Sequence, residues 1–338
     1  MRILLTGGRL AETLHLSRLL HQLGAEIIVA DSLPYNLTSL SQSVRQSYYV
    51  PPAKKEPMRF AYSLLDIIRK EAISLLIPTC EELYTVLRYE TLLRPHVEIF
   101  APSFKNSLAV LSPFRFYEWM KTIKLPTLPI FRFTSIPSIM SDIQKNGDNR
   151  VYSPEWLSYP IIQQKEKTPS IICTPQNPWI GWDETHTKQW KSYSWIKQGT
   201  VLFHVIYDHP ENDIPQSEKQ IKDWIESFAK QTSYTGQLSS TFVEYNDQIV
   251  VHSCTPELTS GIYWLKCRKN EEKQPLNTIS DIVMNLQEST CSPSFSLIDP
   301  IPTIGSFLQH SVIAYRSIRR GLSIEQGTRF DIEWGAER

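Results

Sequence analysis

Paired cysteines, long apolar runs and an excess of either charge are all missing from this sequence. Its five cysteines are odd in number, widely spaced and without a C-x-x-C pair, which favours reduced thiols in a cytoplasmic protein over a disulfide framework or a zinc site. Lys and Arg total 35, as do Asp and Glu, so no basic excess indicates nucleic acid or a membrane surface as a partner. No run approaches the roughly 18 apolar residues of a membrane span, and the amino-terminal MRILLTGG is typical of a strand rather than a signal peptide. We therefore expect a cytoplasmic protein that binds neither nucleic acid nor membrane.

Glycine is also scarce, with 12 in 338 residues, and none occurs from Asp148 through Ile180. A phosphate-binding loop uses glycines so that several backbone N–H groups can converge on the anion. The sequence contains no P-loop, HExxH or G-x-S-x-G motif either. These absences remove the motif-based case for a P-loop nucleotide hydrolase, a zinc protease or an α/β-hydrolase.

What is present is the composition of a soluble globular protein, with 41% apolar and 21% charged residues in a chain long enough for two or three domains. A short apolar strand at 2–5 runs into Thr6-Gly7-Gly8-Arg9, and a second strand at 26–30 ends on Asp31. Between them, leucines at i, i+3, i+4 and i+7 predict a helix. Helices at 60–70 and 81–93 and strands at 74–78 and 97–101 continue the alternation. This pattern predicts a doubly wound α/β domain with a parallel sheet at residues 1–105.

The loop after the first strand has two interpretations. A dinucleotide site would need G-x-G-x-x-G and an acid at the end of the second strand. Asp31 is suitably placed, but the glycine pattern is absent, so nicotinamide or flavin binding is disfavoured. Asp31 and Glu82 both follow predicted strands, where open α/β sheets usually bind ligands. The same two acids are equally suited to cap helices or turns, and the sequence leaves these alternatives open.

The rest of the chain mixes helices with hairpin strands. A helix at 112–123 is ended by the prolines of LPTLPI, and residues 141–147 are expected to form a polar join. An amphipathic helix at 216–230 leads to a hairpin in which strands at 238–244 and 248–252 flank the turn Asn246-Asp247. A loop at 266–274, a helix at 279–286 and FDIEW at 330–334 follow. The alternating acids Asp331 and Glu333 are interpreted as the solvated face of a strand rather than a metal site.

Several of these segments carry a family resemblance. LLTGGR, VADSLPYNLTSLSQSVRQSYYVPP and LLIPTCEELY near the amino terminus, with YTGQLSSTF and CTPELTSGI around the hairpin, resemble the ATP-grasp ligases, in the branch of carbamoyl-phosphate synthetase and the carboxylate–amine ligases. The resemblance implies α/β and α+β architecture, with a Rossmann-like preATP-grasp domain at 1–105 and a shortened ATP-grasp domain at 106–338. Within the latter it implies a linking helix (106–130), a shortened phosphate-loop subdomain (165–177), a core sheet (178–265) and a C-terminal segment (266–338).

The resemblance also locates the metal site of the family. Its members hold Mg²⁺ on the ATP phosphates with an Asp, a Glu and an Asn, and an Arg meets the phosphate or acyl-phosphate. The matching positions in this chain are Thr241, Ser253, Thr255 and Glu257, in that order. The resemblance therefore implies the scaffold of the site without its chemical groups, and no metal is expected there.

The ATP pocket implied by the resemblance is altered in the same way. In the relatives, one lysine opens the helix at 112–123 and another follows the strand at 159–162, and both reach ATP phosphates. Here these positions are Pro113 and Gln164. The Gln-Glu pair that binds the adenine edge is replaced by Trp182-Asp183. Because an indole is larger and more apolar than a glutamine side chain, we expect Trp182 to fill the space of the adenine. A surface or interface tryptophan is the alternative.

A small-molecule cleft in the first domain matches the family pattern better than the ATP site does. By the resemblance, its residues are Gly7, Gly8, Arg9, Ser32, Cys80, Glu81 and Glu82. They stand in loops that follow the strands of an open α/β sheet, which is the usual ligand position. We expect this cleft to be the best-preserved ligand site of the chain.

Two functions are compatible with this resemblance. The first is a catalytically degenerate ATP-grasp protein that acts as a binding or partner module, for an active ligase or for another copy of itself, with no cofactor expected. The second is a working ATP-dependent carboxylate–amine or carboxylate–thiol ligase that forms an acyl-phosphate. In the second, ATP and Mg²⁺ would be held by relocated acids among Glu244, Asp247 and Glu257.

Overall fold

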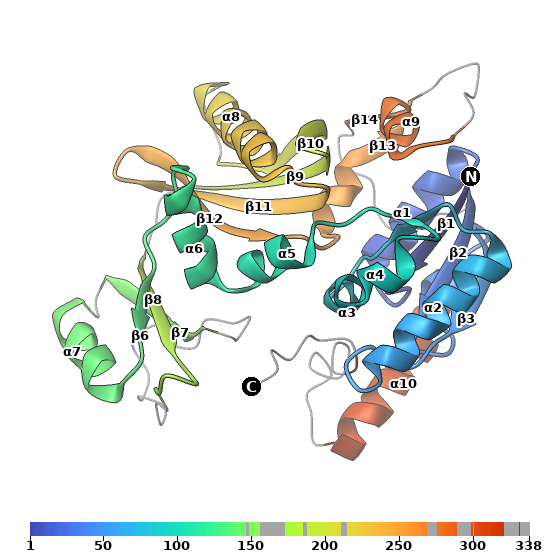
Figure 1. Ribbon diagram of the computed structural model, residues 1–338, viewed down its shortest axis with the longest axis horizontal. Helices are drawn as coiled ribbons and strands as arrows, with labels where there is room; N and C mark the ends of the chain where they lie inside the picture. Colours follow the sequence, from blue (N-terminus) through green and yellow to red (C-terminus); the bar gives the residue numbers. More distant parts are fainter. Residues whose placement is uncertain are drawn as a thin grey trace.

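A parallel sheet, two antiparallel sheets and a short strand pair make up the computed structural model (Figure 1). The structure describes residues 1–146, 149–155, 173–184, 188–210, 215–268, 276–288, 299, 301–320 and 331. In Figure 1 the parallel sheet lies at one side, the larger antiparallel sheet in the middle and the smaller one at the other side. No helix in these ranges is long and apolar enough to cross a bilayer.

The amino-terminal sheet has five parallel strands in the order β3-β2-β1-β4-β5. The strands are β1 (Arg2–Thr6), β2 (Glu26–Asp31), β3 (Val44–Tyr49), β4 (Leu75–Ile77) and β5 (Glu98–Ile99). Side chains alternate between its faces, so Ile3 and Leu5 pack toward α1 (Ala11–Gln22) while Leu4 packs toward α2 (Pro57–Glu71). The predicted doubly wound α/β arrangement is confirmed.

Two local features of this sheet differ from the prediction. β3 was not expected, because its side chains are mostly exposed or half-buried and give no apolar pattern. It is preceded by the short 3₁₀ helix η1 (Thr38–Leu40). The helix expected at 81–93 is divided at Tyr89 into α3 (Glu82–Arg88) and α4 (Glu90–Leu93).

The chain then passes through α5 (Phe104–Leu111) and α6 (Pro113–Thr122) to a three-stranded antiparallel sheet. Its order is β6-β8-β7, from β6 (Phe131–Phe133), β7 (Arg150–Pro154) and β8 (Trp179–Asp183). The polar join expected at 141–147 is wrong, because α7 (Ile136–Asn146) continues through residue 146. Ile139 and Ile143 give this helix an apolar face, which packs on Phe133 and Tyr152. The strand expected at 159–162 lies outside the described residues.

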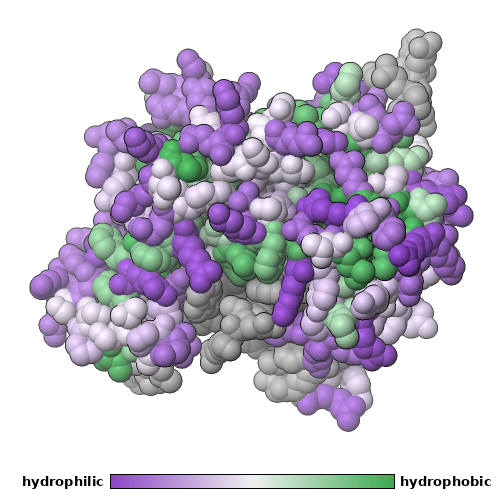
Figure 2. All heavy atoms as spheres, in the orientation of Figure 1, coloured by the Kyte–Doolittle hydropathy of each residue, from purple (hydrophilic) through white to green (hydrophobic). Residues whose placement is uncertain are grey.

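The central sheet has four antiparallel strands in the order β10-β9-β11-β12. They are β9 (Gln189–Lys197), β10 (Thr200–Asp208), β11 (Gly236–Tyr245) and β12 (Gln248–Thr255). The predicted hairpin is confirmed, and Asn246 and Asp247 form its turn with φ values of 50° and 60°. α8 (Pro215–Thr232) buries Ile221 and Phe228 against this sheet and turns a hydrophilic face outward (Figure 2).

The C-terminal segment returns to the amino-terminal domain. The 3₁₀ helix η2 (Ser260–Trp264) leads into β13 (Leu265–Cys267), which pairs with β14 (Leu286–Glu288) after the helix α9 (Ile279–Met284). α10 (Ile301–Arg320), which the sequence did not predict, lies beneath the parallel sheet in Figure 1. Two hydrogen bonds connect it to the amino-terminal loops: the side chain of Gln309 donates to the carbonyl of Arg9 and accepts from the backbone N–H of Leu37.

Candidate functional site

The loops that follow β1, β2 and β4 meet at one edge of the parallel sheet. Because β1 lies between the other two strands, residues 7–9, 32 and 79–82 come side by side. The structure therefore brings together the residues predicted for the ligand cleft, all of them buried except the half-buried Glu81. Gly7 has a φ of 66°, and a Cβ atom there would lie 2.5 Å from Sγ of Cys80, so glycine is required. Ligand binding by these loops stays a prediction.

Arg9 is the centre of a buried ion-pair network in this cluster. Its Nη2 lies 2.5 Å from Oδ1 of Asp31 and donates to Oγ of Ser32 at 2.8 Å, and its Nη1 lies 2.6 Å from Oδ1 of Asp331. The guanidinium is fully buried. Burial alone would lower the pKa of Arg9, but the two carboxylates raise it above its ordinary value. Asp31 is therefore an ion-pair partner rather than a helix cap, and it also accepts from the N–H groups of Arg9 and Leu33.

Asp331 does not lie on a solvated face, so that expectation is wrong. The residue is 5% exposed, and its second carboxylate oxygen accepts from Ser32 Oγ at 2.9 Å. A buried guanidinium needs an acceptor for each of its nitrogens. Asp31 accepts from Nε and Nη2 of Arg9, and Asp331 accepts from Nη1. Burial opposes the charged form of Asp331, yet Arg9 lowers the pKa of this carboxyl below its usual range.

Glu82 is the second buried acid at this edge. Its Oε1 accepts from Thr6 Oγ1 at 2.6 Å, while Oε2 has no hydrogen-bond partner among the described residues. Burial raises the pKa of Glu82, although the bond from Thr6 works in the opposite direction. A buried carboxylate with one unpaired oxygen is costly to stability, which is typical of a functional position.

The chain itself covers much of this loop cluster. The backbone N–H of Leu258, in the loop after β12, donates to the carbonyl of Thr79 at 3.1 Å. Gln309 from α10 reaches Arg9 from the opposite end of the sequence. The cluster is therefore the place where the amino-terminal domain, the central sheet and the C-terminal segment meet.

The predicted metal-ligand positions lie on the central hairpin. Thr241 on β11 stands directly opposite Ser253 on β12, next to a bulge, and Thr255 pairs with Ser239. These three positions offer hydroxyl groups where the resemblance implies two carboxylates and an amide, and their relation to a metal site stays a prediction. Across the described ranges, no group of three or more His, Cys, Asp or Glu side chains is arranged to hold a metal ion.

Glu257 lies at the junction between the hairpin and the amino-terminal domain. Burial raises the pKa values of Cys80 and Tyr84, and the negative charge of Glu257 raises them further. The carboxylate is therefore close to both side chains. An anion stands where the resemblance implies a phosphate-binding arginine.

The relocated acids proposed for an active ligase do not converge on this site. Glu244 lies opposite Ile249, nearer the hairpin tip than the Thr241–Ser253 pair, and forms a partly exposed ion pair with Lys188 at 3.5 Å. Asp247 is exposed in the turn itself. With Glu257 beyond the other end of β12, the three acids are spread along the hairpin.

Trp182 joins the two antiparallel sheets. Its ring centroid lies 5.7 Å from that of His252 on β12, and its side chain packs on Leu128, Val243 and Val250. The residue is half-buried, so it is neither fully enclosed in the predicted adenine space nor a surface tryptophan. The indole thus occupies part of the gap between β8 and the central hairpin.

Asp183 strengthens the same connection. Tyr245 on β11 donates its hydroxyl to Asp183 Oδ2 at 3.2 Å, and Arg150 on β7 forms an ion pair with Asp183 at 2.8 Å and with Asp142 at 2.9 Å. The guanidinium of Arg150 also stacks 3.8 Å over the ring of Phe131. Neither Asp183 nor Arg150 is left with an unpaired charge for a nucleotide.

The start of α6 has a structural role. Pro113 occupies its first turn, and Ser112 caps the helix by accepting from the N–H of Arg115. Ser112 also donates to the buried Glu155 at 2.6 Å, whose other oxygen accepts from Arg132 at 2.7 Å. Gln164, the other predicted phosphate position, lies outside the described residues.

The sequence did not single out three residues that contact Trp182 or Asp183 in the gap: His252, Tyr245 and Arg150. It also did not single out the buried Glu155 beside α6. The strand around His252 was predicted, but which face its imidazole takes depends on the bulge beside Ser253, and no local signal marks that bulge. Arg150 is the one of these residues that the sequence could have indicated, because an arginine near Asp142 and Asp183 is a candidate ion-pair partner for them.

Comparison with solved structures agrees with this architecture. The chain superimposes on N5-carboxyaminoimidazole ribonucleotide synthetase from Thermotoga maritima with a TM-score of 0.61 at 14% identity, covering 85% of this chain and 77% of that one. It matches N5-carboxyaminoimidazole synthetase from Staphylococcus aureus complexed with ADP (TM-score 0.56, 11% identity, 78% and 72% covered). It also matches the biotin carboxylase domain of 2-oxoglutarate carboxylase from Hydrogenobacter thermophilus, in complex with MgADP, ADP and bicarbonate (TM-score 0.55, 11% identity, 76% and 64% covered).

These similarities confirm the predicted fold, and the chain has the architecture of the ATP-grasp ligases. No family profile matches the sequence, and no curated protein sequence is significantly similar to it. At such low identity the comparison establishes the fold alone, so the function must be argued from the side chains of this chain.

Proposed function

We propose that this chain is an ATP-grasp-fold protein without ligase activity, which works as a binding or partner module for an active ligase or for a second copy of itself. The observation that carries the proposal is the gap between β8 and the central hairpin, where Trp182 contacts His252 and Tyr245 bonds to Asp183. Side chains of the protein hold the two sheets together at the place where the resemblance puts the adenine.

The residues at the phosphate end of the same gap do not fit Mg·ATP. Mg²⁺ is usually held by one or two carboxylates together with substrate phosphates, whereas Thr241, Ser253 and Thr255 offer neutral hydroxyls. Glu257 adds a negative charge in place of a positive one. At an effective dielectric near 20, a unit charge pair about 4 Å apart is worth ~4 kcal/mol, so exchanging attraction for repulsion costs several orders of magnitude in nucleotide affinity.

The amino-terminal loop cluster is the part of the fold that we propose to retain a small-molecule ligand. Its polar side chains are buried at the carboxyl edge of the parallel sheet, and Glu82 Oε2 has no bonded partner among the described residues. Such an acceptor favours a ligand that donates a hydrogen bond. This proposal supports a sensor or partner role, since ligand binding here would not require ATP.

A gain-of-function experiment tests the proposal. Replacing Thr241, Ser253, Thr255 and Glu257 by Asp, Glu, Asn and Arg, together with Trp182→Gln and Asp183→Glu, restores the metal-site and adenine-edge residues implied by the resemblance and leaves Pro113 and Gln164 unchanged. The restored variant should bind Mg·ATP more tightly than the native chain, and circular dichroism checks that it is folded. A native chain that already releases phosphate from ATP in the presence of amines or carboxylates would contradict the proposal.

A further inference from the structure

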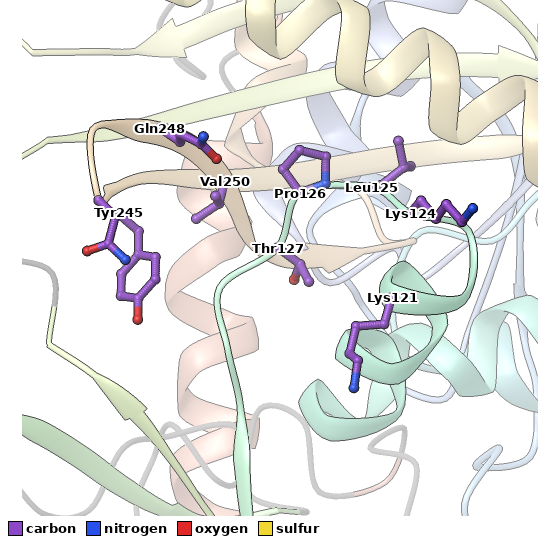
Figure 3. A pocket seen from close by; sticks show the side chains of 9 residues that line it. Lys121, Lys124, Leu125, Pro126, Thr127, Tyr245, Gln248 and Val250 are labelled. Carbon is purple, nitrogen blue, oxygen red and sulfur yellow. The ribbon is translucent and has the colours of Figure 1, made fainter.

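A cavity of about 630 Å³ lies where the end of α6 separates from the β11–β12 hairpin (Figure 3). One wall comes from the end of α6 and the segment at 124–127, and the other from the hairpin residues Tyr245, Asn246, Gln248 and Val250. Small-molecule sites typically have volumes of roughly 300–1,000 Å³, so the cavity has room for a ring-sized ligand. Tyr245 and Val250 separate it from the gap that Trp182 occupies.

The cavity has two chemically different ends. Figure 3 shows Lys121 and Lys124 at one end, Tyr245 at the other and Thr127 between them. The described residues that line it include no carboxylate, although the chain as a whole carries equal numbers of acids and bases. A lining with two ammonium groups and no acid favours an anionic ligand.

Lys124 occupies a backbone position that normally belongs to glycine. It follows the C-cap of α6 and has a φ of 57°. The N–H of Lys124 donates to the carbonyl of Lys121, and the N–H of Leu125 donates to the carbonyl of Met120. These two bonds form a Schellman motif, whose left-handed residue is usually glycine because other side chains are strained there. A lysine in this place keeps a positive charge at the mouth of the cavity at a conformational cost.

Lys124 is the lysine whose charge is available to a ligand. The ammonium group of Lys121 forms an exposed ion pair with Glu118 at 3.6 Å and lies 5.4 Å from the centroid of the Tyr117 ring, both on its own helix. For Lys124 the described part of the chain provides no hydrogen bond or ion pair. Basic residues at a helix end do favour the helix dipole, but that role does not require the left-handed conformation of Lys124.

The opposite end of the cavity is uncharged and held in place. The hydroxyl of Tyr245 donates to Asp183 at 3.2 Å, and that of Thr127 donates to the carbonyl of Val251 at 3.3 Å. Pro126 and Val250 add apolar surface. A planar apolar group therefore fits beside the tyrosine ring.

We propose that this cavity binds a small organic anion with a planar ring. The phosphate or carboxylate of the ligand lies at the lysine end and is bound by Lys124, and its ring lies toward Tyr245. The site does not depend on the proposed loss of ligase activity, because it lies outside the nucleotide gap.

Calorimetry with phenyl phosphate, benzoate and phenol at low ionic strength tests the site. Phenyl phosphate or benzoate should bind, and phenol should bind about tenfold more weakly or not at all, since one charge-assisted hydrogen bond is worth about a factor of ten. Binding of phenyl phosphate alone indicates a phosphorylated ligand, and binding of benzoate alone indicates a carboxylate. Added salt should weaken the binding.

The variant K124G separates a ligand role from a structural one. Glycine suits the left-handed position, so K124G should keep or raise the melting temperature while weakening anion binding about tenfold. K230A on the exposed face of α8 is the matched control and should leave binding unchanged. The proposal is overturned if neither anion binds, if phenol binds as tightly as the anions, or if K124G retains full affinity.

Discussion

The indole of Trp182 on β8 lies 5.7 Å from the imidazole of His252 on β12, ring centroid to ring centroid, and so bridges the smaller and the larger antiparallel sheet. Both side chains are half-buried. Substitution of Trp182 therefore tests the proposed loss of nucleotide binding.

Trp182→Ala should destabilise the protein by about 2 kcal/mol, less than the ~3–5 kcal/mol of a fully buried tryptophan, because the indole is half-buried. The truncated variant should also be stabilised by adenosine, which the native chain should not bind. Thermal melts with and without adenosine measure both effects. Trp119→Ala is the matched control, since Trp119 packs on Phe228 away from the gap. An unchanged melting temperature without any adenosine effect would show that Trp182 has no role in the gap.

Asp331→Asn should lower the free energy of unfolding at neutral pH by about 2 kcal/mol, because a buried hydrogen bond to a charged group is lost. The pKa of Asp331 is lowered in the folded state, so its stabilising contribution is present above the unfolded pKa of about 3.9 and disappears as the pH falls through the folded value. Urea titrations of both proteins should therefore differ at pH 7 and converge in acid. Equal stability at pH 7 would contradict the buried network around Arg9.

His204 should make the protein less stable in mild acid. Burial lowers its pKa to about 4, its Nδ1 lies 2.8 Å from Ser194 Oγ, and its buried Nε2 has no partner in the described part of the chain. The unfolded chain takes up this proton near pH 6.5 and the folded chain near pH 4, so stability falls between these values, by roughly 3 kcal/mol in total. His204→Asn should flatten the stability curve in this window. Parallel curves for the two proteins would show that the imidazole is not held neutral.

Glu82→Gln should stabilise the protein above about pH 4.5. Burial raises the pKa of this carboxyl, so the folded state resists its ionisation and loses stability as the pH rises from the unfolded toward the folded value. A neutral amide removes that cost and leaves an oxygen to accept from Thr6. Chemical denaturation at pH 7 measures the gain. A loss of stability instead would indicate that the ionised carboxylate has a favourable partner.

Much of the fold could be predicted because its signals are local. The leucine spacing of α1 and the Asn246-Asp247 turn each lie within one element, and each was confirmed. β3 escaped prediction because an edge strand with exposed side chains has no apolar alternation. The apolar face of α7 was overlooked, because the polar residues at 141–147 were interpreted as a join.

The candidate site was predictable only in part. The turn fixes the register near the hairpin tip, but Thr241 stands opposite Ser253 only because of the bulge between Thr241 and Phe242, and β12 continues through Ser253, which was expected in the following loop. The contact between Arg9 and Asp331 joins residues 322 positions apart, and no periodicity or motif in either segment indicates it. Long-range pairs of this kind depend on where the C-terminal segment docks, which sequence patterning does not specify.

Titration calorimetry of the native chain with ATP in the presence and absence of Mg²⁺ is the most direct measurement of the central claim. The K124G variant is titrated in parallel, so that any anion bound at the lysine cavity is recognised and subtracted. The account predicts no Mg²⁺-dependent binding in either protein. A Mg²⁺-dependent dissociation constant in the low micromolar range, shared by the native chain and K124G, would contradict it.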